Sequence, residues 1–286
     1  MVNQPLVSIC IPTYNVENFI QETLNACLNQ TYKNIEIIIS DNCSTDKTVS
    51  LIKDYGDPRI KIFSNSVNEG LLFNFKKVLS YATGDYISLL SADDGMEPET
   101  VAKAVVVLEA PENKDIVLIN TYIQVINSEG KKIFNKKSPF GGGRISSYRA
   151  IRSNFLFGTN VLGEPNGSLF RKSAYDKIPE PKFLNGNSWT IDIDIKLELL
   201  LQGDAFTIPE YLGKFRLSDQ STSVSNLKLV QAKLFREYAY RVYRDRRYGL
   251  SSFLVLTATG NSLILELARN IVYLIFNRQP GKKKTV

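Results

Sequence analysis

Short apolar runs alternate with longer amphipathic segments through the first 120 residues, and this alternation restricts the fold more than any other feature. The apolar runs have the length and β-branched composition of strands, and they lie at 6–11, 35–39, 60–63, 86–90 and 116–119. The segments with clear helical spacing lie at 17–29, 71–81 and 98–108. Strands that alternate with helices are typical of a parallel sheet covered on both faces. The predicted fold class is therefore α/β, with a mostly parallel sheet and flanking helices.

The pattern changes after residue 120. The sequence there predicts a hairpin, a short strand, a helix and two strands around Pro209, at 121–134, 167–171, 191–201, 205–208 and 211–215. From residue 227 the chain is expected to be helical and basic, and the formal net charge of +6 comes wholly from this segment. A length of 286 residues fits one large domain with an appendage. We expect a domain over 1–226, divided near residue 120, and a C-terminal helical extension over 227–286.

The chain contains no histidine, which excludes several kinds of site at once. Ser–His–Asp triads, Cys–His nucleophiles and histidine-bound zinc all need that side chain. Any general base must then be Asp, Glu, Lys or Tyr. Cys10, Cys27 and Cys43 have no C-x-x-C spacing and are predicted to be free thiols in a reducing compartment. We recognise no leader and no apolar run of about 18 residues, and expect a cytoplasmic protein.

Acidic side chains follow two of the predicted strands. In an open parallel sheet, ligands bind at the carboxyl ends of the strands. The first strand ends in the polar loop Pro-Thr-Tyr-Asn at 12–15, the second ends at Asp41, and the fourth is followed by Asp93 and Asp94. Any one of these acids could instead cap a helix or form a turn. Together they predict a nucleotide site at this edge of the sheet.

Four blocks of the sequence resemble, in order and spacing, those of family-2 glycosyltransferases with the GT-A fold. The blocks read VSICIPTYN, IEIIISDNCSTDKT, ATGDYISLLSADDG and IDIDIKLELLLQGDAFTIPEYLGKFRLSDQSTSVS. The resemblance spans about residues 6–225. It implies a nucleotide-sugar-binding part over 1–120 and an acceptor-side part over 121–226. It further implies inverting transfer of a sugar from a UDP-, dTDP- or GDP-sugar to an acceptor hydroxyl, in the synthesis of cell-surface polysaccharide or another glycan.

The resemblance also implies roles for residues at matching positions. Asp41 would accept a hydrogen bond from the base, either N3–H of uracil or thymine or N1–H of guanine. Asp93 and Asp94 would hold Mg²⁺ or Mn²⁺ against the diphosphate. Asp192, at the start of the helix predicted at 191–201, would be the general base. The residues expected to contact the donor are Pro12, Thr13, Tyr14, Asn15, Asp41, Asn68, Gly70, Asp93 and Arg216.

Two positions depart from the family's pattern. Ser91 stands where the family often has an acid, so the metal motif reads SADD. The histidine that often follows a Tyr-Arg pair is absent, and the corresponding stretch reads FRLS. Contact with metal or phosphate there would fall to Arg216, Ser218 or water. Asp194 lies two residues after Asp192 and points to a different face of the helix, so it is interpreted as a solvent-facing or helix-dipole residue.

Other functional classes share parts of this pattern. A Rossmann dehydrogenase needs G-x-G-x-x-G at the first turn, and the sequence PTYNV excludes it. A nucleotidyltransferase has a similar sheet and acidic site but usually opens with a glycine-rich, basic phosphate loop. A non-catalytic sugar-nucleotide-binding or scaffold protein is a further alternative, because of Ser91 and the missing histidine. A nucleic-acid partner would rest on the basic tail alone, and we expect none.

The segment LILELARNIVYLIF at 263–276 is apolar except for one narrow polar stripe. The stripe consists of Glu266, Arg269, Asn270 and Tyr273, and basic residues flank the segment on both sides. This combination is typical of a helix on an anionic membrane surface. Packing against the catalytic domain, or against a second copy in a homodimer, is the alternative. We expect peripheral binding to the inner face of the cell membrane, where a lipid-linked sugar acceptor would lie.

Overall fold

The computed structural model describes residues 4–180, 182, 187, 189–218 and 230–276, with side chains in the last helix described as far as residue 268. The expected boundary between residues 226 and 227 lies outside these ranges, so the division into domain and extension stays a prediction. The basic residues after 276 and the side chains of Arg269, Asn270 and Tyr273 also lie outside them.

The first 115 residues form strands that alternate with helices, as predicted. The strands are β1 (Val7–Thr13), β2 (Ile35–Asp41), β3 (Ile60–Ser64), β4 (Tyr86–Leu89) and β5 (Gly95–Met96). The helices are α1 (Ile20–Leu28), α2 (Thr48–Lys53), α3 (Leu71–Ser80), α4 (Thr100–Glu109) and the short 3-10 turn η1 (Pro111–Asn113). Every residue of β1 and β2 is buried, because helices cover the sheet on both faces.

The second half adds strands and helices of more varied length. The strands are β6 (Ile116–Ile126), β7 (Lys132–Lys136), β8 (Gly143–Ile145), β9 (Leu169–Arg171) and β10 (Asp204–Arg216). The helices are α5 (Ser147–Phe157), α6 (Lys172–Asp176), α7 (Ile191–Leu200), α9 (Val230–Arg244), α10 (Ser252–Phe276) and the 3-10 turn η2 (Arg246–Tyr248).

Three expectations for this half were wrong in detail. The strand at 116–119 and the first hairpin strand at 121–126 form one strand, β6, which is buried along almost its whole length. The two strands expected around Pro209 also form one strand, β10. Its register against β6 shifts between Ile208 and Tyr211, and this irregularity accommodates a proline that cannot donate a hydrogen bond. The sequence analysis missed helix α5, although Ser146 caps its first turn and Gly158 ends it in a left-handed conformation.

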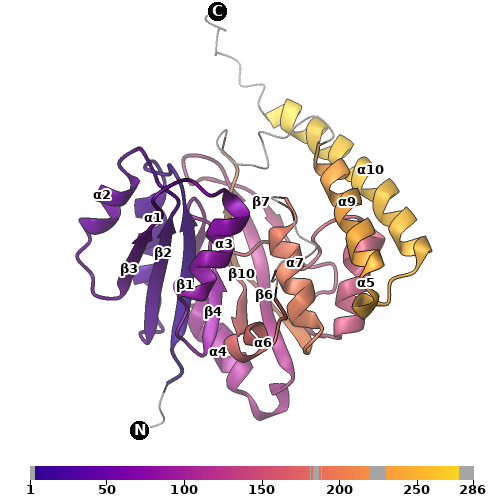
Figure 1. Cartoon of the computed structure of the whole chain (residues 1–286), viewed down its shortest axis with the longest axis horizontal. Helices are drawn as coiled ribbons and strands as arrows, with labels where there is room; N and C mark the ends of the chain where they lie inside the picture. The colour runs from indigo at the N-terminus through magenta and orange to yellow at the C-terminus, as the bar shows by residue number, and fades with distance from the viewer. Residues whose placement is uncertain (1–3, 181, 183–186, 188, 219–229, 277–286) are drawn as a thin grey trace, which may run out of the picture.

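All the described strands belong to one ten-stranded sheet with a parallel centre (Figure 1). Its main order is β3-β2-β1-β4-β9-β6-β10-β5, while β7 pairs with β6 and β8 with β10. Strand β9 is antiparallel to both of its neighbours, so β4 and β6 run in the same direction, and β10 is parallel to β6. The predicted α/β class, with a mostly parallel sheet, flanking helices and C-terminal helices, is confirmed.

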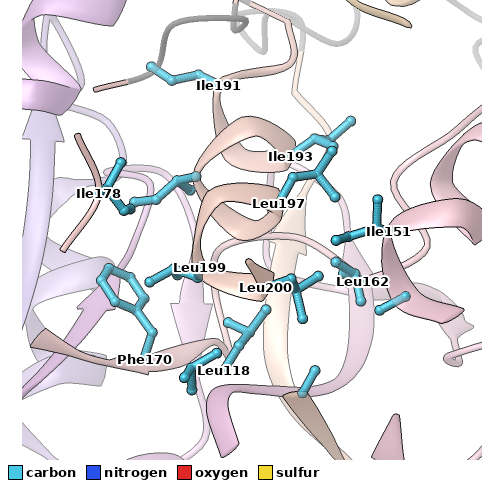
Figure 2. Close-up of a cluster of buried hydrophobic side chains, with 14 of the residues drawn as sticks. Leu118, Ile151, Leu162, Phe170, Ile178, Ile191, Ile193, Leu197, Leu199 and Leu200 are labelled. Carbon is cyan, nitrogen blue, oxygen red and sulfur yellow. The ribbon is translucent and has the colours of Figure 1, made fainter. Parts of the chain in front are cut away.

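Helix α7 lies in the larger of two hydrophobic clusters and is buried on almost every side, its charged residues included. Figure 2 shows Ile193 and Leu197 on the side of α7 that faces Ile151 of α5, while Leu199 lies toward Phe170 of β9. A helix buried on all sides must be covered by other elements on all sides. Helices α5 and α9 provide much of that cover, so the C-terminal part of the chain shares its core with the element that carries Asp192.

Helices α9 and α10 lie side by side, and α10 also packs against α5 (Figure 1). Glu266 of α10 is buried, and its carboxylate accepts hydrogen bonds from the backbone N–H groups of Gln231 and Ala232, at 3.2 and 2.6 Å. These donors belong to the first turn of α9, whose N–H groups lack partners within the helix. The polar stripe of α10 thus faces the protein at Glu266.

The opposite side of α10 exposes large apolar side chains. We call this surface the α10 apolar face, and it consists of Phe253, Leu256, Leu263, Ile264 and Leu267. Among the described residues, no helix combines the length and hydropathy needed to cross a bilayer.

Candidate active site

The loops after β1 and β2 meet at the same edge of the sheet. The register of the two strands pairs Thr13 with Asp41, and the N–H of Asn42 donates to the carbonyl of Thr13 at 2.9 Å. Asn15 adopts a positive φ of 49°, an uncommon conformation outside glycine. Its N–H donates to Ser44 Oγ at 2.9 Å, and its side-chain oxygen accepts from the N–H of Thr45 at 2.8 Å. The two loops therefore brace each other, and Tyr14 is left 45% exposed above them.

A group of asparagines fixes the loop at residues 65–70 against the end of β2. Asn42 donates to Asn68 Oδ1 at 2.7 Å and accepts from the N–H of Glu69 at 3.0 Å. Asn68 Oδ1 also accepts from the N–H of Gly70 at 2.9 Å. Gly70 has a φ of +85°, which is strained for any other residue, and it directly precedes α3. Side-chain hydrogen bonds thus hold the predicted donor-facing residues Asn68 and Gly70 in one arrangement.

Asp41 lies at the centre of these loops and is 1% exposed. Its Oδ2 accepts a hydrogen bond from the N–H of Ser44 at 3.1 Å. Its Oδ1 is buried, and no described group of the protein donates a hydrogen bond to it. Buried acceptors are nearly always satisfied, because leaving one unpaired costs about 1–3 kcal/mol. This oxygen is therefore available to an N–H donor of a ligand.

Asp94 follows β4 and is 1% exposed. As in Asp41, only one of its two carboxylate oxygens accepts a hydrogen bond from the described residues. Its Oδ1 accepts from the backbone N–H of Arg216 at 2.8 Å, whereas Oδ2 is buried without a hydrogen-bond partner among the described residues. Burial, together with the negative charge of Asp93, raises the pKa of Asp94 well above its usual range. A proton or a cation at Oδ2 would relieve this unfavourable state.

Arg216 is 1% exposed and holds the acidic loop from β10. Its guanidinium donates to the carbonyls of Asp93, Asn127 and Ser128 at 2.8, 3.0 and 3.0 Å. It also pairs with Glu22 at 2.6 Å. These contacts position Asp93 and Asp94 next to the loop between β6 and β7. The predicted contact between Arg216 and the donor stays a prediction.

The acidic pair fits a hard divalent cation that retains most of its water. Among the described residues, no group of three or more Cys, Asp or Glu side chains is arranged to hold a metal ion. Mg²⁺ is commonly held by one or two carboxylates together with substrate phosphates, and carboxylates also suit Mn²⁺. Asp94, with a buried unpaired oxygen, and the partly exposed Asp93 match that donor set. Ser91 contributes its carbonyl to the turn, accepting from the N–H of Asp94 at 3.1 Å.

Asp192 lies in the first turn of α7 and is partly exposed. Its Oδ2 accepts from Asn160 Nδ2 at 2.7 Å. Burial and the negative charge of Glu164 raise the pKa of Asp192 to about 6, although the positive charge of Lys196 opposes the shift. A carboxylate with a pKa near 6 is a stronger base than an ordinary aspartate and is still mostly ionised at neutral pH.

Lys196 lies one helical turn after Asp192 and is 3% exposed. Its Nζ donates to the carbonyls of Gly163 and Glu164 at 2.7 and 3.2 Å. Burial lowers the pKa of Lys196 to about 8, despite the opposing charges of Asp192 and Glu164. The lysine thus ties the loop at 160–164 to α7, directly beside Asp192.

Glu164 is the acid that connects the two halves of the site. Its charge raises the pKa of both Asp94 and Asp192, so it lies within electrostatic reach of each. It also pairs with Lys136 of β7 at 2.6 Å. The sequence analysis missed Glu164 and Asn160, which lie in a turn-rich segment without a recognisable motif. It also assigned no role to Lys196, which lies in the same block as Asp192.

Asp194 lies in the first turn of α7, as a helix-dipole residue would, but its interpretation as solvent-facing was wrong. Asp194 is fully buried, because α9 covers its side of α7. Burial and the neighbouring Asp194 carboxylate raise the pKa of Tyr238, on α9, well above its usual range. The two carboxylates of α7 therefore have different surroundings: Asp192 accepts from Asn160 near Glu164, whereas Asp194 lies beside Tyr238 of α9.

Three comparisons with known proteins agree with this arrangement. The sequence model of glycosyl transferase family 2 matches residues 8–179. An uncharacterized glycosyltransferase of Haemophilus influenzae is 31% identical over 235 residues, which is 79% of this chain and 70% of the relative.

Two solved structures share the fold at lower sequence identity. TarS 1–349 of S. aureus in complex with UDP-GlcNAc superimposes with a TM-score of 0.64 and 18% identity, over 90% of this chain and 71% of that one. The mannosyltransferase PcManGT of Pyrobaculum calidifontis, in complex with GDP-Man and Mn²⁺, gives 0.61 and 17%, over 99% of this chain and 77% of that one. Fold, acidic loops and sequence agree, and the chain belongs to glycosyl transferase family 2.

Proposed function

We propose that this chain is a metal-dependent, inverting glycosyltransferase that moves a sugar from a nucleotide-sugar to an acceptor hydroxyl. The observation that carries the proposal is the pair of buried carboxylate oxygens, Asp41 Oδ1 and Asp94 Oδ2, that lack hydrogen-bond partners among the described residues. They follow strands on either side of β1, at the edge where open α/β sheets bind ligands. One is suited to an N–H donor of a base and the other to a cation.

The donor would bind across the ends of β1 and β2. Asp41 Oδ1 would accept the N–H of uracil, thymine or guanine, so UDP-, dTDP- and GDP-sugars are the candidate donors. Tyr14 would cover the base, with Pro12, Thr13 and Asn15 forming the adjoining wall. TarS and PcManGT, whose structures contain UDP-GlcNAc and GDP-Man respectively, support a nucleotide-sugar donor without selecting between the bases.

Asp93 and Asp94 would hold Mg²⁺ or Mn²⁺ next to the diphosphate. When bound, the ion supplies positive charge that stabilises the departing nucleoside diphosphate. The Mn²⁺ in the PcManGT structure supports an ion of this class. The chain's own contribution is positional: the backbone N–H of Arg216 fixes one oxygen of Asp94, and its guanidinium fixes the carbonyl of Asp93.

Asp192 would take the proton of the acceptor hydroxyl. The hydroxyl oxygen forms a bond to the anomeric carbon while the bond from that carbon to the diphosphate oxygen breaks. The proton passes to Asp192, and the electron pair of the broken bond leaves with the diphosphate. Asn160 orients the carboxylate through its 2.7 Å hydrogen bond, and a single displacement of this kind inverts the anomeric configuration.

The α10 apolar face supports a peripheral position on an anionic membrane surface. Phe253, Leu256 and Ile264 are 66, 72 and 64% exposed, and Arg241 and Arg244 lie in the last turn of the adjacent α9. Apolar and basic side chains together favour the headgroup region of anionic lipids. An acceptor linked to a lipid, in the synthesis of a cell-surface glycan, would lie at the same surface on the inner face of the cell membrane. A second copy of the chain is the alternative partner for this face.

Two measurements test this function. Nucleotide binding is tested by calorimetric titration of UDP, GDP and dTDP into the full-length chain with and without Mn²⁺. We expect one of the three to bind most tightly and Mn²⁺ to strengthen its binding. Inversion is tested by NMR of the product's anomeric centre, and retention of the donor configuration would contradict the single displacement at Asp192.

Membrane binding is tested by sedimentation with anionic vesicles at low salt. Deleting 251–286 would remove buried residues that α10 contributes to the core, such as Leu254 and Ala258, so surface substitutions are the sharper test. Leu256→Glu is expected to reduce sedimentation while donor binding is unchanged. If the wild-type chain ignores such vesicles, and its dimerisation depends on Leu256, the face is a contact between copies instead.

A further inference from the structure

A cavity of about 450 Å³ opens between β6, the end of β7, the loop after α5, and α10. Its lining includes Ile123, Lys136, Lys137, Phe157, Asn160 and Ile264. These residues come from segments more than 100 positions apart in the chain, so the cavity exists only because α10 packs against α5. Nothing in the donor side of the site uses it.

The cavity adjoins the candidate base. Asn160, which lines it, donates through Nδ2 both to Asp192 Oδ2 and to the carbonyl of Gly163, each at 2.7 Å. Lys136, a second lining residue, is paired with Glu164 at 2.6 Å. A molecule seated in the cavity would therefore lie next to the carboxylate that takes the acceptor's proton. This position belongs to the acceptor and not to the nucleotide.

The cavity walls are mainly apolar and continue onto the surface of α10. Val161 and Leu162 line the interior and are 7 and 3% exposed. Phe157 and Ile264 line it as well but are 44 and 64% exposed, so they form its open side. Ile264 is also part of the α10 apolar face. An apolar chain can pass from that face into the cavity without crossing a polar surface.

Positive charge lies at the opposite wall. Lys136 and Lys137 follow each other at the end of β7, and Lys137 is exposed. Lys136 forms an ion pair with Glu164, whereas Lys137 forms none with any described residue. A lysine beside an apolar cavity favours a ligand with an anionic group attached to an apolar chain. A neutral sugar would leave both features unused.

We propose that this cavity binds the carrier end of the acceptor, an amphiphile in which a phosphate adjoins an apolar chain. The phosphate lies at Lys137, the chain runs along Phe157 and Ile264, and the acceptor sugar is directed toward Asp192. The inference rests on the proposed transferase function and specifies its acceptor class. It assigns the lysine–apolar cavity to the acceptor itself and not to the headgroup of a bilayer lipid.

The test is calorimetric titration of farnesyl phosphate, a prenyl chain with one phosphate, into the full-length chain below its micellar concentration. Farnesol and inorganic phosphate separate the contributions of chain and charge. Lys137→Glu and Ile264→Glu are expected to weaken farnesyl phosphate binding at least about tenfold, which corresponds to about 1.4 kcal/mol. Two control substitutions lie outside the cavity lining and are expected to leave this binding unchanged: Lys132→Glu, on the strand that Lys137 follows, and Leu256→Glu, on the same helix as Ile264.

The remaining outcomes overturn the inference in distinguishable ways. Equal weakening by Ile264→Glu and Leu256→Glu would show a general apolar surface and no cavity site. Equal affinity for farnesol and farnesyl phosphate would remove the role of Lys137. UDP, GDP and dTDP are titrated in parallel. If the wild-type chain binds one of them, and neither cavity substitution changes farnesyl phosphate binding, this inference alone is contradicted. Failure to bind any nucleotide would contradict the proposed function instead. Melting curves confirm that each variant is folded.

Discussion

The donor side and the acceptor side of the site differ in how their polar groups are satisfied. On the donor side, Asn42, Asn68 and Asn15 bond to neighbouring loops, while one oxygen each of Asp41 and Asp94 has no partner in the described part of the chain. On the acceptor side, the charged groups all have hydrogen-bond or ion-pair partners in the protein. Lys196 bonds to backbone carbonyls, Glu164 pairs with Lys136, and Asp192 accepts from Asn160.

This difference indicates which groups each half of the site would use in the reaction. On the donor side, hydrogen bonds between a few short loops hold two carboxylate oxygens in place for a ligand, so ligand binding there depends on those loops. The acceptor side is an electrostatic network in which the pKa of Asp192 depends on residues of the loop at 160–164 and of α7. Substitutions on the donor side should therefore remove binding or turnover outright, whereas those on the acceptor side should shift the pH dependence and positioning.

The largest effect is expected at Asp94. Asp94→Asn preserves shape but removes the charge that would hold the divalent ion, and such ions contribute several kcal/mol to transition-state stabilisation. We expect transfer to fall by at least about 10³-fold, which corresponds to about 4 kcal/mol. EDTA should have the same effect on the wild-type enzyme, and Mn²⁺ or Mg²⁺ should reverse it. Full turnover by Asp94→Asn without added metal would show that transfer does not require the ion.

The next largest effect separates the two carboxylates of α7. Asp192→Asn keeps its size but cannot accept the proton, and we expect kcat to fall by at least about 10²-fold with nucleotide binding unchanged. Asp194→Asn is the matched control. It disturbs a buried group beside Tyr238, so it should lower the melting temperature and leave the kcat of the folded enzyme near the wild-type value. The reverse result would assign the base to Asp194.

A smaller effect is expected at Asp41. Removing one hydrogen bond to a charged acceptor costs about 1.5–3 kcal/mol, so Asp41→Ala should weaken nucleotide binding by roughly tenfold to a hundredfold. Calorimetry with UDP, GDP and dTDP measures this loss and identifies the base. Asp46→Ala provides a nearby control, since Asp46 bonds to backbone N–H groups of Glu17 and Thr48 at the rim of the same loops. Unchanged nucleotide binding in Asp41→Ala would place the base elsewhere.

The smallest effect is a shift in pH dependence. Because the pKa of Asp192 is about 6, kcat/KM should rise as pH increases through about 6 and then level off as the base ionises. The charge of Lys196 opposes the raised pKa. Lys196→Met removes that charge, so the rising limb should move to higher pH. Lys53→Met, an exposed change on α2, should leave the profile in place. If Lys196→Met leaves the pH profile unchanged, the charge of Lys196 does not affect the pKa of the base.

The same comparison explains what the sequence could predict. Asp41, Asp93 and Asp94 were found because each follows an apolar strand within a short motif, and strand and motif are local features. Glu164 and Asn160 were missed because they approach Asp192 only after a long irregular segment has packed against α7. The cavity beside them needs α10, which lies about 100 residues later, to be placed on α5.

The secondary-structure predictions also succeeded where the sequence signal was local and clear. The alternating first half was predicted well because buried parallel strands are continuous apolar runs. Helix α5 was missed although Ser146 and Gly158 are ordinary cap residues, because its apolar face is narrow and arginines interrupt it. Strand β10 was divided at Pro209 because a proline usually interrupts a ladder, whereas here a register shift against β6 accommodates it.

The most direct test of the central claim is the release of nucleoside diphosphate from a panel of UDP-, dTDP- and GDP-sugars by the full-length chain, with and without Mn²⁺. The account predicts that at least one donor is cleaved, that cleavage requires the divalent ion, and that Asp94→Asn abolishes it. Tight nucleotide binding without metal-dependent cleavage of any donor in the panel would contradict it. That result would instead identify a non-catalytic sugar-nucleotide-binding member of the family.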